Sequence, residues 1–168
     1  MGRVSIFLSI HHRNNMNIPQ RYIPKTLKRK DQQKQKENIR RSRKAYLKGQ
    51  YLSRPHLESF IKKESPHIKR AKEFYGVNSI SDSPELARKS GCSRSSLRKI
   101  LNKGRGAYYS SGSRPNQTAE SWARARLASS LTGGPASRVD ASILEEGCSK
   151  NSRALKKSRG ATHYQGPE

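Results

Sequence analysis

The sequence predicts a mainly α, small and irregular helical domain with long basic extended arms at both ends. Of the 168 residues, 31% are hydrophobic and 7% aromatic, which is too little apolar side chain for a large core. Lys and Arg total 36 against 12 Asp and Glu, which gives a net charge of +24. We expect that the mutual repulsion of these charges is relieved by an anionic partner. Apolar residues in the middle of the chain recur at helical spacing, and strand alternation is absent beyond the first residues.

The N-terminal arm, residues 1–24, is expected to be extended because Pro19 and Pro24 do not fit a helix interior. Its apolar run Val4–Ile10 is too short to span a bilayer and lacks a signal-peptide cleavage site. We therefore expect this run to be an edge strand or an anchor on a neighbouring molecule. Met16 is an alternative start of translation.

Residues 25–64 are predicted to form a basic helical arm. Thr26 is the expected N-cap, and Gly49 is the expected end of the helix. Basic residues fall on every face of this predicted helix, so it is either a solvated helix or an arm that binds a polyanion. The charge density favours the polyanion-binding arm.

A small helical core is predicted over residues 65–148. Ser-Pro pairs at positions 65 and 83 are typical helix starts, and Gly76 is a typical stop. Residues 83–104, with a turn at Gly91, resemble a helix-turn-helix segment, which binds DNA in some proteins and is a plain helical hairpin in others. If it works as in the DNA-binding family, the second helix presents Arg94, Ser95, Arg98, Lys99 and Lys103 to phosphates and base edges.

The stretch 104–118, "GRGAYYSSGSRPNQT", is predicted to be a loop before a further helix that is capped by Thr118 and ends at Gly133. Interleaved glycine, arginine and tyrosine suit nucleic-acid phosphates and stacked bases, and they suit a protein groove equally well. Alternatively, the aromatic side chains fill the small core. The candidate binding residues are Arg105, Tyr108, Tyr109, Arg114, Asn116, Gln117 and Trp122. Beyond the core, residues 149–168 are predicted to be a basic tail without structure of its own.

The sequence carries none of the motifs of an enzyme or a metalloprotein. The two cysteines are too few for a disulfide scaffold or a zinc site, which fits an intracellular, reducing origin. No phosphate-binding loop, zinc-peptidase motif or paired-carboxylate motif is present, and a triad of Ser110, a histidine and Asp140 has no supporting spacing. We expect a protein that is not an enzyme, uses no cofactor or metal, and does not bind small molecules.

Several blocks resemble a family of short basic uncharacterised proteins of nucleocytoplasmic large DNA viruses, including algal viruses. They are "RRSRKAYLKGQYLSRP", "HIKRAKEFYGV", "ELARKSGCS", "KGRGAYYSSGSRPNQTAESWARARLASSLTGGPASRVD" and "EEGC". The resemblance covers residues 22–148 and implies a viral setting, without an activity to transfer.

In such a virus, basic proteins organise the genome or lie beneath the capsid shell. We expect a non-enzymatic virion structural protein, made in the infected host cell. Most concretely, it would be a minor capsid (cement) protein on the inner side of the capsid, bridging capsomers through its helical core and basic arms. The expected partners are the major capsid protein and other minor capsid proteins, and also viral DNA or the anionic inner-membrane surface. The alternative is a helix-turn-helix DNA-binding protein in viral genome packaging or transcription.

Overall fold

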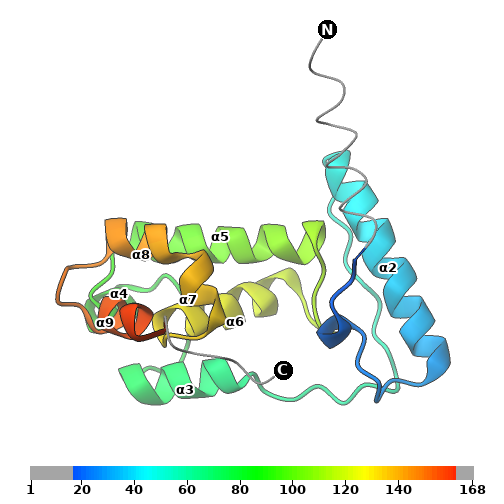
Figure 1. Ribbon diagram of the computed structural model, residues 1–168, viewed down its shortest axis with the longest axis horizontal. Coiled ribbons are helices and arrows are strands. Elements are labelled where there is room, and N and C mark those ends of the chain that lie inside the picture. Colours follow the sequence, from blue (N-terminus) through cyan, green and yellow to red (C-terminus); the bar gives the residue numbers. More distant parts are fainter. Residues whose placement is uncertain (1–16, 162–168) are drawn as a thin grey trace, which may run out of the picture. The chain divides into compact units, whose positions relative to one another are not determined.

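The computed structural model describes residues 17–161, and the prediction of a mainly helical fold is confirmed. Within these residues the chain forms eight α-helices and one short 3-10 helix, and no strand is longer than a single bridge. Much of the two predicted arms, including the apolar run Val4–Ile10 and Met16, lies outside the described residues. Figure 1 shows the order of the helices along the chain.

The helices belong to two compact units, each built from two stretches of the chain. Unit 1 contains residues 17–62 and Gly106–Ala119, and unit 2 contains Lys63–Arg105 and residues 120–161. The first stretch of unit 1 ends at Lys62, and the predicted end of the basic arm is residue 64. The stretch 104–118, which we predicted to be part of the core, falls mostly in unit 1.

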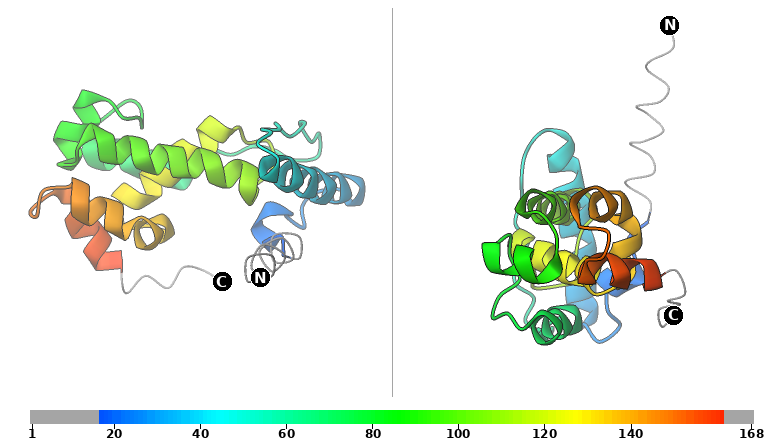
Figure 2. Two further views of the ribbon diagram at one scale, coloured as in Figure 1. Left: turned by 90° about the horizontal axis from the view of Figure 1, so that it is seen from above. Right: turned by 90° about the vertical axis from the view of Figure 1, so that its left-hand side faces the viewer.

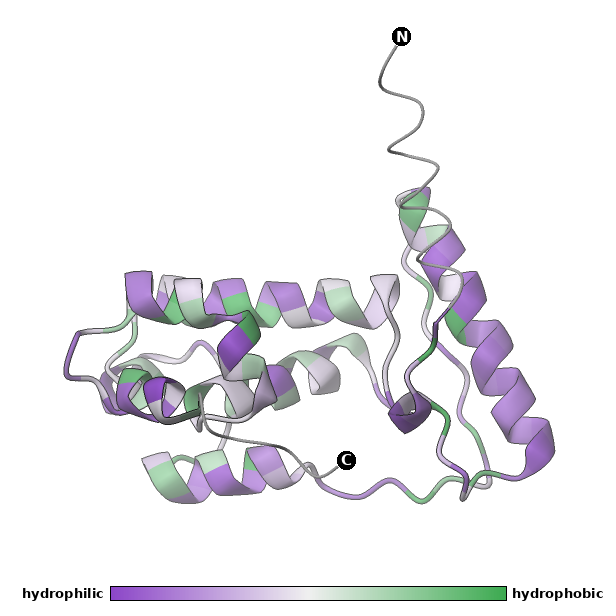
Figure 3. Ribbon diagram, in the orientation of Figure 1, coloured by the Kyte–Doolittle hydropathy of each residue, from purple (hydrophilic) through white to green (hydrophobic). Residues whose placement is uncertain are grey.

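Unit 1 holds the 3-10 helix η1 (Gln20–Tyr22) and the long helix α2 (Arg29–Leu47). Helix α2 begins later than the expected cap at Thr26, and it ends just before Gly49, whose φ of 75° turns the chain. Figure 3 shows α2 as hydrophilic along most of its length.

The inner face of α2 is polar and is satisfied by the backbone of unit 1. The buried Gln35 side chain donates to the carbonyl oxygens of Tyr22 and Ser113, at 3.1 and 3.2 Å. The buried Arg43 guanidinium donates to the carbonyl oxygen of Ser111 at 2.8 Å. Ile39, which is fully buried, is the main apolar residue of this face. Helix α2 is therefore fixed in unit 1 largely by hydrogen bonds, because buried polar groups need partners.

Unit 2 is a helical assembly around an apolar core. Its helices are α3 (Pro66–Tyr75), α4 (Pro84–Ser90), α5 (Arg94–Ser110, of which the last turn belongs to unit 1), α6 (Ala119–Leu131), α7 (Pro135–Val139), α8 (Ala141–Gly147) and α9 (Arg153–Gly160). The core contains six leucines that are at most 1% exposed: Leu86, Leu97, Leu127, Leu131, Leu144 and Leu155. Figure 2 shows how α8 and α9 follow each other in this unit.

Two of the predicted helix ends have the left-handed glycines that such ends require. Gly76 and Gly91 have φ values of 63° and 77°, as a sharp turn after α3 and after α4 demands. Gly104, by contrast, was predicted to end the third helix and instead lies inside α5. A Cβ atom at Gly104 would lie 2.6 Å from the Cα of Ala123, so this glycine permits the close crossing of α5 and α6. The prediction of a glycine loop from residue 104 is therefore wrong as far as Ser110.

The C-terminal part of unit 2 is folded, contrary to the predicted tail from residue 149. Ser152 caps α9 by accepting a hydrogen bond from the Leu155 backbone N–H at 3.1 Å, and the Leu155 side chain is buried. Cys92, between α4 and α5, forms a disulfide with Cys148 at the end of α8. We expected reduced cysteines, and this pairing contradicts that expectation. The bond joins two residues that are 56 positions apart in the sequence.

Candidate nucleic-acid interface

The exposed face of α2 is a dense row of cations. Seven of its basic residues are exposed: Arg29, Lys30, Lys34, Lys36, Arg40, Arg41 and Lys44. At about 100° per residue they fall within an arc of roughly 160° of the helix, and the buried residues occupy the other side. The exposed basic residues therefore lie on one side of α2, and Arg43 is the basic residue on the buried side. From Arg29 to Lys44 the row extends about 22 Å along the helix axis, at 1.5 Å per residue.

These seven cations have no acidic partner in the part of the chain that the structure describes. No carboxylate of residues 17–161 lies within ion-pair distance of any of them. Glu37, which shares their face of the helix, accepts a hydrogen bond from Gln33 instead. Cations that repel one another at this density favour binding of an anion with regularly spaced charges.

Tyr108 and Asn116, two of the predicted binding residues, are used inside unit 1. Tyr108 is 1% exposed, and the guanidinium carbon of Arg54 lies 3.7 Å from its ring centroid. Arg54 also donates to the Tyr108 carbonyl oxygen and the Ser113 hydroxyl, both at 2.8 Å, and burial lowers the pKa of Arg54. Asn116, with a φ of 58°, accepts from the Leu57 backbone N–H at 2.8 Å. The Tyr108 ring and the Asn116 amide thus hold the fold together.

The other residues predicted in this stretch are placed differently. Arg105 forms two hydrogen bonds with the Glu120 carboxylate, at 2.7 and 3.2 Å, and these lower the pKa of Glu120. Arg114 is exposed, whereas Trp122 and Gln117 are half-buried. Tyr109 is half-buried, and its ring lies against Tyr51, which sequence reasoning did not single out. The interleaved tyrosine and lysine residues in "KAYLKGQY" are a signal that could have identified Tyr51.

The predicted reader residues of α5 all lie on the surface of unit 2. Arg94, Ser95, Arg98, Lys99 and Lys103 are exposed, and α4 and α5 are joined by the predicted turn. Arg98 pairs with the Asp82 carboxylate at 2.8 Å and lowers its pKa, and Arg94 donates to the Asp82 carbonyl oxygen. Lys103 lies 3.5 Å from Asp140. Three of these five side chains therefore have intramolecular partners, whereas of the seven exposed cations of α2 only Arg41 has one in the described chain, the Asn38 amide oxygen at 3.3 Å.

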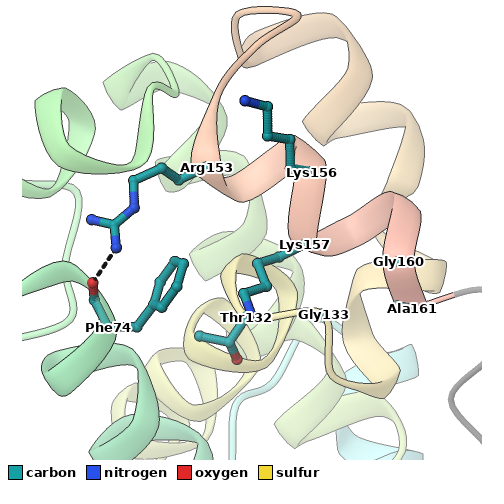
Figure 4. A pocket seen from close by; sticks show the side chains of 8 residues that line it. All are labelled: Phe74, Thr132, Gly133, Arg153, Lys156, Lys157, Gly160 and Ala161. Atoms are coloured by element: carbon teal, nitrogen blue, oxygen red, sulfur yellow. Dashed lines mark hydrogen bonds between the residues drawn. The ribbon is translucent and has the colours of Figure 1, made fainter.

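A hollow of about 590 Å³ lies beside α9 in unit 2. Figure 4 shows the Phe74 ring between the side chains of Arg153 and Lys157, while Lys156 points away. The Arg153 guanidinium carbon is 4.1 Å from the ring centroid of Phe74, and the Lys157 ammonium is 4.8 Å from it. Two of the three cations that line this hollow are thus engaged with an aromatic ring, and their role is to attach α9 to α3.

A metal site and a Ser–His–Asp triad were also considered for the sequence, and the described residues bear on both. Residues 17–161 hold no group of three His, Cys, Asp or Glu side chains that could bind a metal ion. The carboxylate of Asp140, a member of the triad considered above, is buried and bonded to Arg126 at 2.7 and 3.0 Å and to Ser130 at 2.7 Å. None of the described helices is both long and apolar enough to cross a membrane.

The chain belongs to a protein family of unknown function, DUF5824, whose profile matches residues 19–143. That match covers α2 and almost all of unit 2 up to α8, and it stops before α9. No curated protein and no solved structure matches the chain.

Proposed function

We propose that this protein is a non-enzymatic nucleic-acid-binding protein whose helix α2 binds the phosphates of the nucleic acid. The observation that carries this proposal is the row of seven exposed cations on α2 without acidic partners in the described part of the chain. Each cation that neutralises a phosphate releases a bound counterion, and this release is the main driving force for sequence-independent binding. Unit 2 then has the role of a folded scaffold, because several of its cations are paired with carboxylates.

In the viral setting that the sequence resemblance implies, this activity is genome binding. It is closer to the alternative function considered for the sequence than to cementing of capsomers, because two residues expected to dock on a partner, Tyr108 and Asn116, are bonded inside unit 1. It differs from the helix-turn-helix hypothesis in placing the main contact on α2 instead of α5.

The test is a salt titration of DNA binding with two matched triple variants. Replacing Lys30, Lys34 and Arg41 by Ala removes three cations from one side of α2. We expect the slope of log K against log salt to fall by about 2 to 3, and the affinity at 0.1 M salt to fall roughly 10²-fold. The control variant removes three exposed cations of α5 by the substitutions Arg94→Ala, Arg98→Ala and Lys99→Ala, and we expect a smaller loss from it.

The two variants also separate the hypotheses. A larger loss from the α5 variant would identify the helix-turn-helix segment as the binding site and overturn the assignment to α2. Equal affinity of both variants and the unaltered protein would overturn nucleic-acid binding through either helix.

A minor capsid role is kept as a second candidate because of one observation in the extended segment after α2. Ile61 is 82% exposed there, and an apolar side chain on an extended segment suits insertion into a pocket of a neighbouring protein. Fractionation of purified virions with nuclease and high salt distinguishes the two roles. Retention with washed capsid shells would support the capsid role, and steeply salt-dependent release with the DNA would support genome binding.

A further inference from the structure

The chain contains two Ser-Pro pairs, Ser65-Pro66 and Ser83-Pro84, and no Thr-Pro pair. Both serines occupy the N-cap position of a helix of unit 2, Ser65 before α3 and Ser83 before α4. A proline disfavours the helical conformation in the residue before it, and both serines are extended, with ψ values of 124° at Ser65 and 153° at Ser83. The two pairs therefore match in sequence and in backbone, and their surroundings set them apart.

The hydroxyl of Ser83 caps its helix, whereas the hydroxyl of Ser65 does not. Ser83 Oγ accepts a hydrogen bond from the Leu86 backbone N–H at 3.1 Å. Ser65 Oγ forms no cap hydrogen bond with α3, and its side chain is partly exposed. A reagent that takes the Ser65 hydroxyl therefore breaks no cap on which α3 depends, while modification of Ser83 removes the cap of α4.

The residues around the two serines differ in the same direction. The two residues before Ser65 and the proline after it are exposed, and the chain enters α3 from a segment without helix or strand (Figure 1). Around Ser83, by contrast, Ile80 and Leu86 are 2% and 0% exposed and belong to the apolar core. An enzyme that modifies a peptide binds several residues around the target in extended form. Such a stretch is accessible up to Ser65, whereas around Ser83 it requires opening of the core.

We infer that Ser65 is a phosphorylation site for a proline-directed serine/threonine protein kinase. Kinases of this class select a proline directly after the target hydroxyl, and Pro66 is exposed in that position. In the reaction, Ser65 Oγ attacks the γ-phosphorus of ATP held by the kinase, and the hydroxyl proton passes to the catalytic aspartate of the kinase. The bond from the γ-phosphorus to the bridging oxygen breaks, and ADP leaves with the electron pair of that bond. The site lies in unit 2 and does not rest on the proposed function of α2.

The phosphate would stand at the start of α3, which has no side-chain cap. A phosphoserine carries about −1.5 to −2 charges at pH 7 and accepts hydrogen bonds from the backbone N–H groups of a first helical turn. Lys69, four residues after Ser65, is exposed and adds a cation at the same end of the helix. Phosphorylation of Ser65 is therefore expected to stabilise α3.

The experiment incubates the full chain with ATP and a small amount of a mitogen-activated protein kinase, and mass spectrometry follows the phosphate on each serine. We expect phosphorylation of Ser65 to be roughly tenfold or more faster than that of Ser83, because Ser83 reacts only when the core opens. Ser65→Ala should remove most of the incorporated phosphate. Pro66→Ala keeps the hydroxyl but removes the proline, and it should slow the reaction at Ser65 to the rate of serines without a following proline. Pro84→Ala is the matched control and should leave the rate at Ser65 unchanged.

Other outcomes overturn the inference in distinguishable ways. No phosphate on Ser65 would exclude the site, and an equal rate at Ser83 would exclude selection by the accessible segment before α3. An undiminished rate in Pro66→Ala would exclude a proline-directed kinase, provided that its circular dichroism spectrum matches that of the unaltered protein. The phosphorylated chain should unfold at a higher temperature than the unmodified chain, and an equal or lower midpoint would overturn the stabilisation of α3 by the phosphate.

Discussion

The two units of this protein are stabilised by different kinds of interaction. In unit 2, leucines from five helices fill an apolar core, and carboxylates such as Asp82, Glu120 and Asp140 pair with neighbouring cations. In unit 1, the buried side of α2 consists mainly of polar groups, several of which bond to backbone carbonyls, and its exposed cations form no ion pair with a carboxylate of residues 17–161. The difference shows that a chain with little apolar side chain can concentrate it in one unit and leave the other unit free to present charge.

Reduction of the disulfide of unit 2 is expected to lower the free energy of unfolding more than the other changes that test this comparison. The Cys92–Cys148 bond closes a loop with a sequence separation of 56, and loss of such a constraint on the unfolded chain costs about 4 kcal/mol. Urea unfolding followed by the fluorescence of Trp122, the one tryptophan of the chain, should show this loss on addition of reductant. A Cys92→Ser, Cys148→Ser variant should be indifferent to reductant. An unchanged midpoint in the unaltered protein would mean that the bond contributes nothing to unit 2.

A smaller effect is expected from two glycines of the same helix that lie in different units. Gly104→Ala would place a methyl group 2.6 Å from the Cα of Ala123, so we expect a loss of about 2–3 kcal/mol in the stability of unit 2. Gly106→Ala meets only the Tyr46 hydroxyl at 3.7 Å and should stabilise the helix by about 0.5–1 kcal/mol. Thermal unfolding by circular dichroism measures both. Equal behaviour of the two variants would show that α5 and α6 do not cross closely at Gly104.

The smallest of these effects tests the polar interior of unit 1. Gln35→Ala removes the donor to the carbonyl oxygens of Tyr22 and Ser113, and we expect a loss of about 1–2 kcal/mol. Gln33→Ala is the control on the same helix, because Gln33 is exposed and bonds only to exposed Glu37 in the described chain. Its unfolding midpoint in urea should stay within error of the unaltered protein. If Gln35→Ala also left the unfolding midpoint unchanged, the hydrogen bonds of Gln35 would not be what fixes α2 in unit 1.

The sequence allowed prediction of those features that depend on neighbouring residues. The Ser-Pro start at position 83 and the left-handed glycines at 76 and 91 were predicted because helix caps have local signatures. Gly104 was misread since a glycine that permits close helix packing has the same local appearance as one that ends a helix. The Cys92–Cys148 pair and the folding of α9 on unit 2 depend on residues far apart in sequence, and no local signal reports them.

The candidate site was predictable in part for the same reason. The charge density of residues 25–64 was visible in the sequence, and so was the surface position of the α5 cations. The one-sided distribution of the α2 cations was not, because Gln35, Ser42 and Arg43 look like solvent-facing residues until their carbonyl partners are known. The burial of Tyr108 under Arg54 was hidden likewise, since those residues are separated by 54 positions.

The discontinuity of unit 1 has a consequence for the order in which the protein is made. The ribosome completes α2 about seventy residues before it completes Gly106–Ala119, the stretch whose carbonyls accept hydrogen bonds from the inner face of α2. Synthesis proceeds at roughly 5 to 20 residues per second. For several seconds α2 is therefore made, but the stretch Gly106–Ala119 that it packs against is not. During this interval α2 exists as a cationic segment whose polar inner face still lacks the backbone carbonyls that hold it in the folded unit 1.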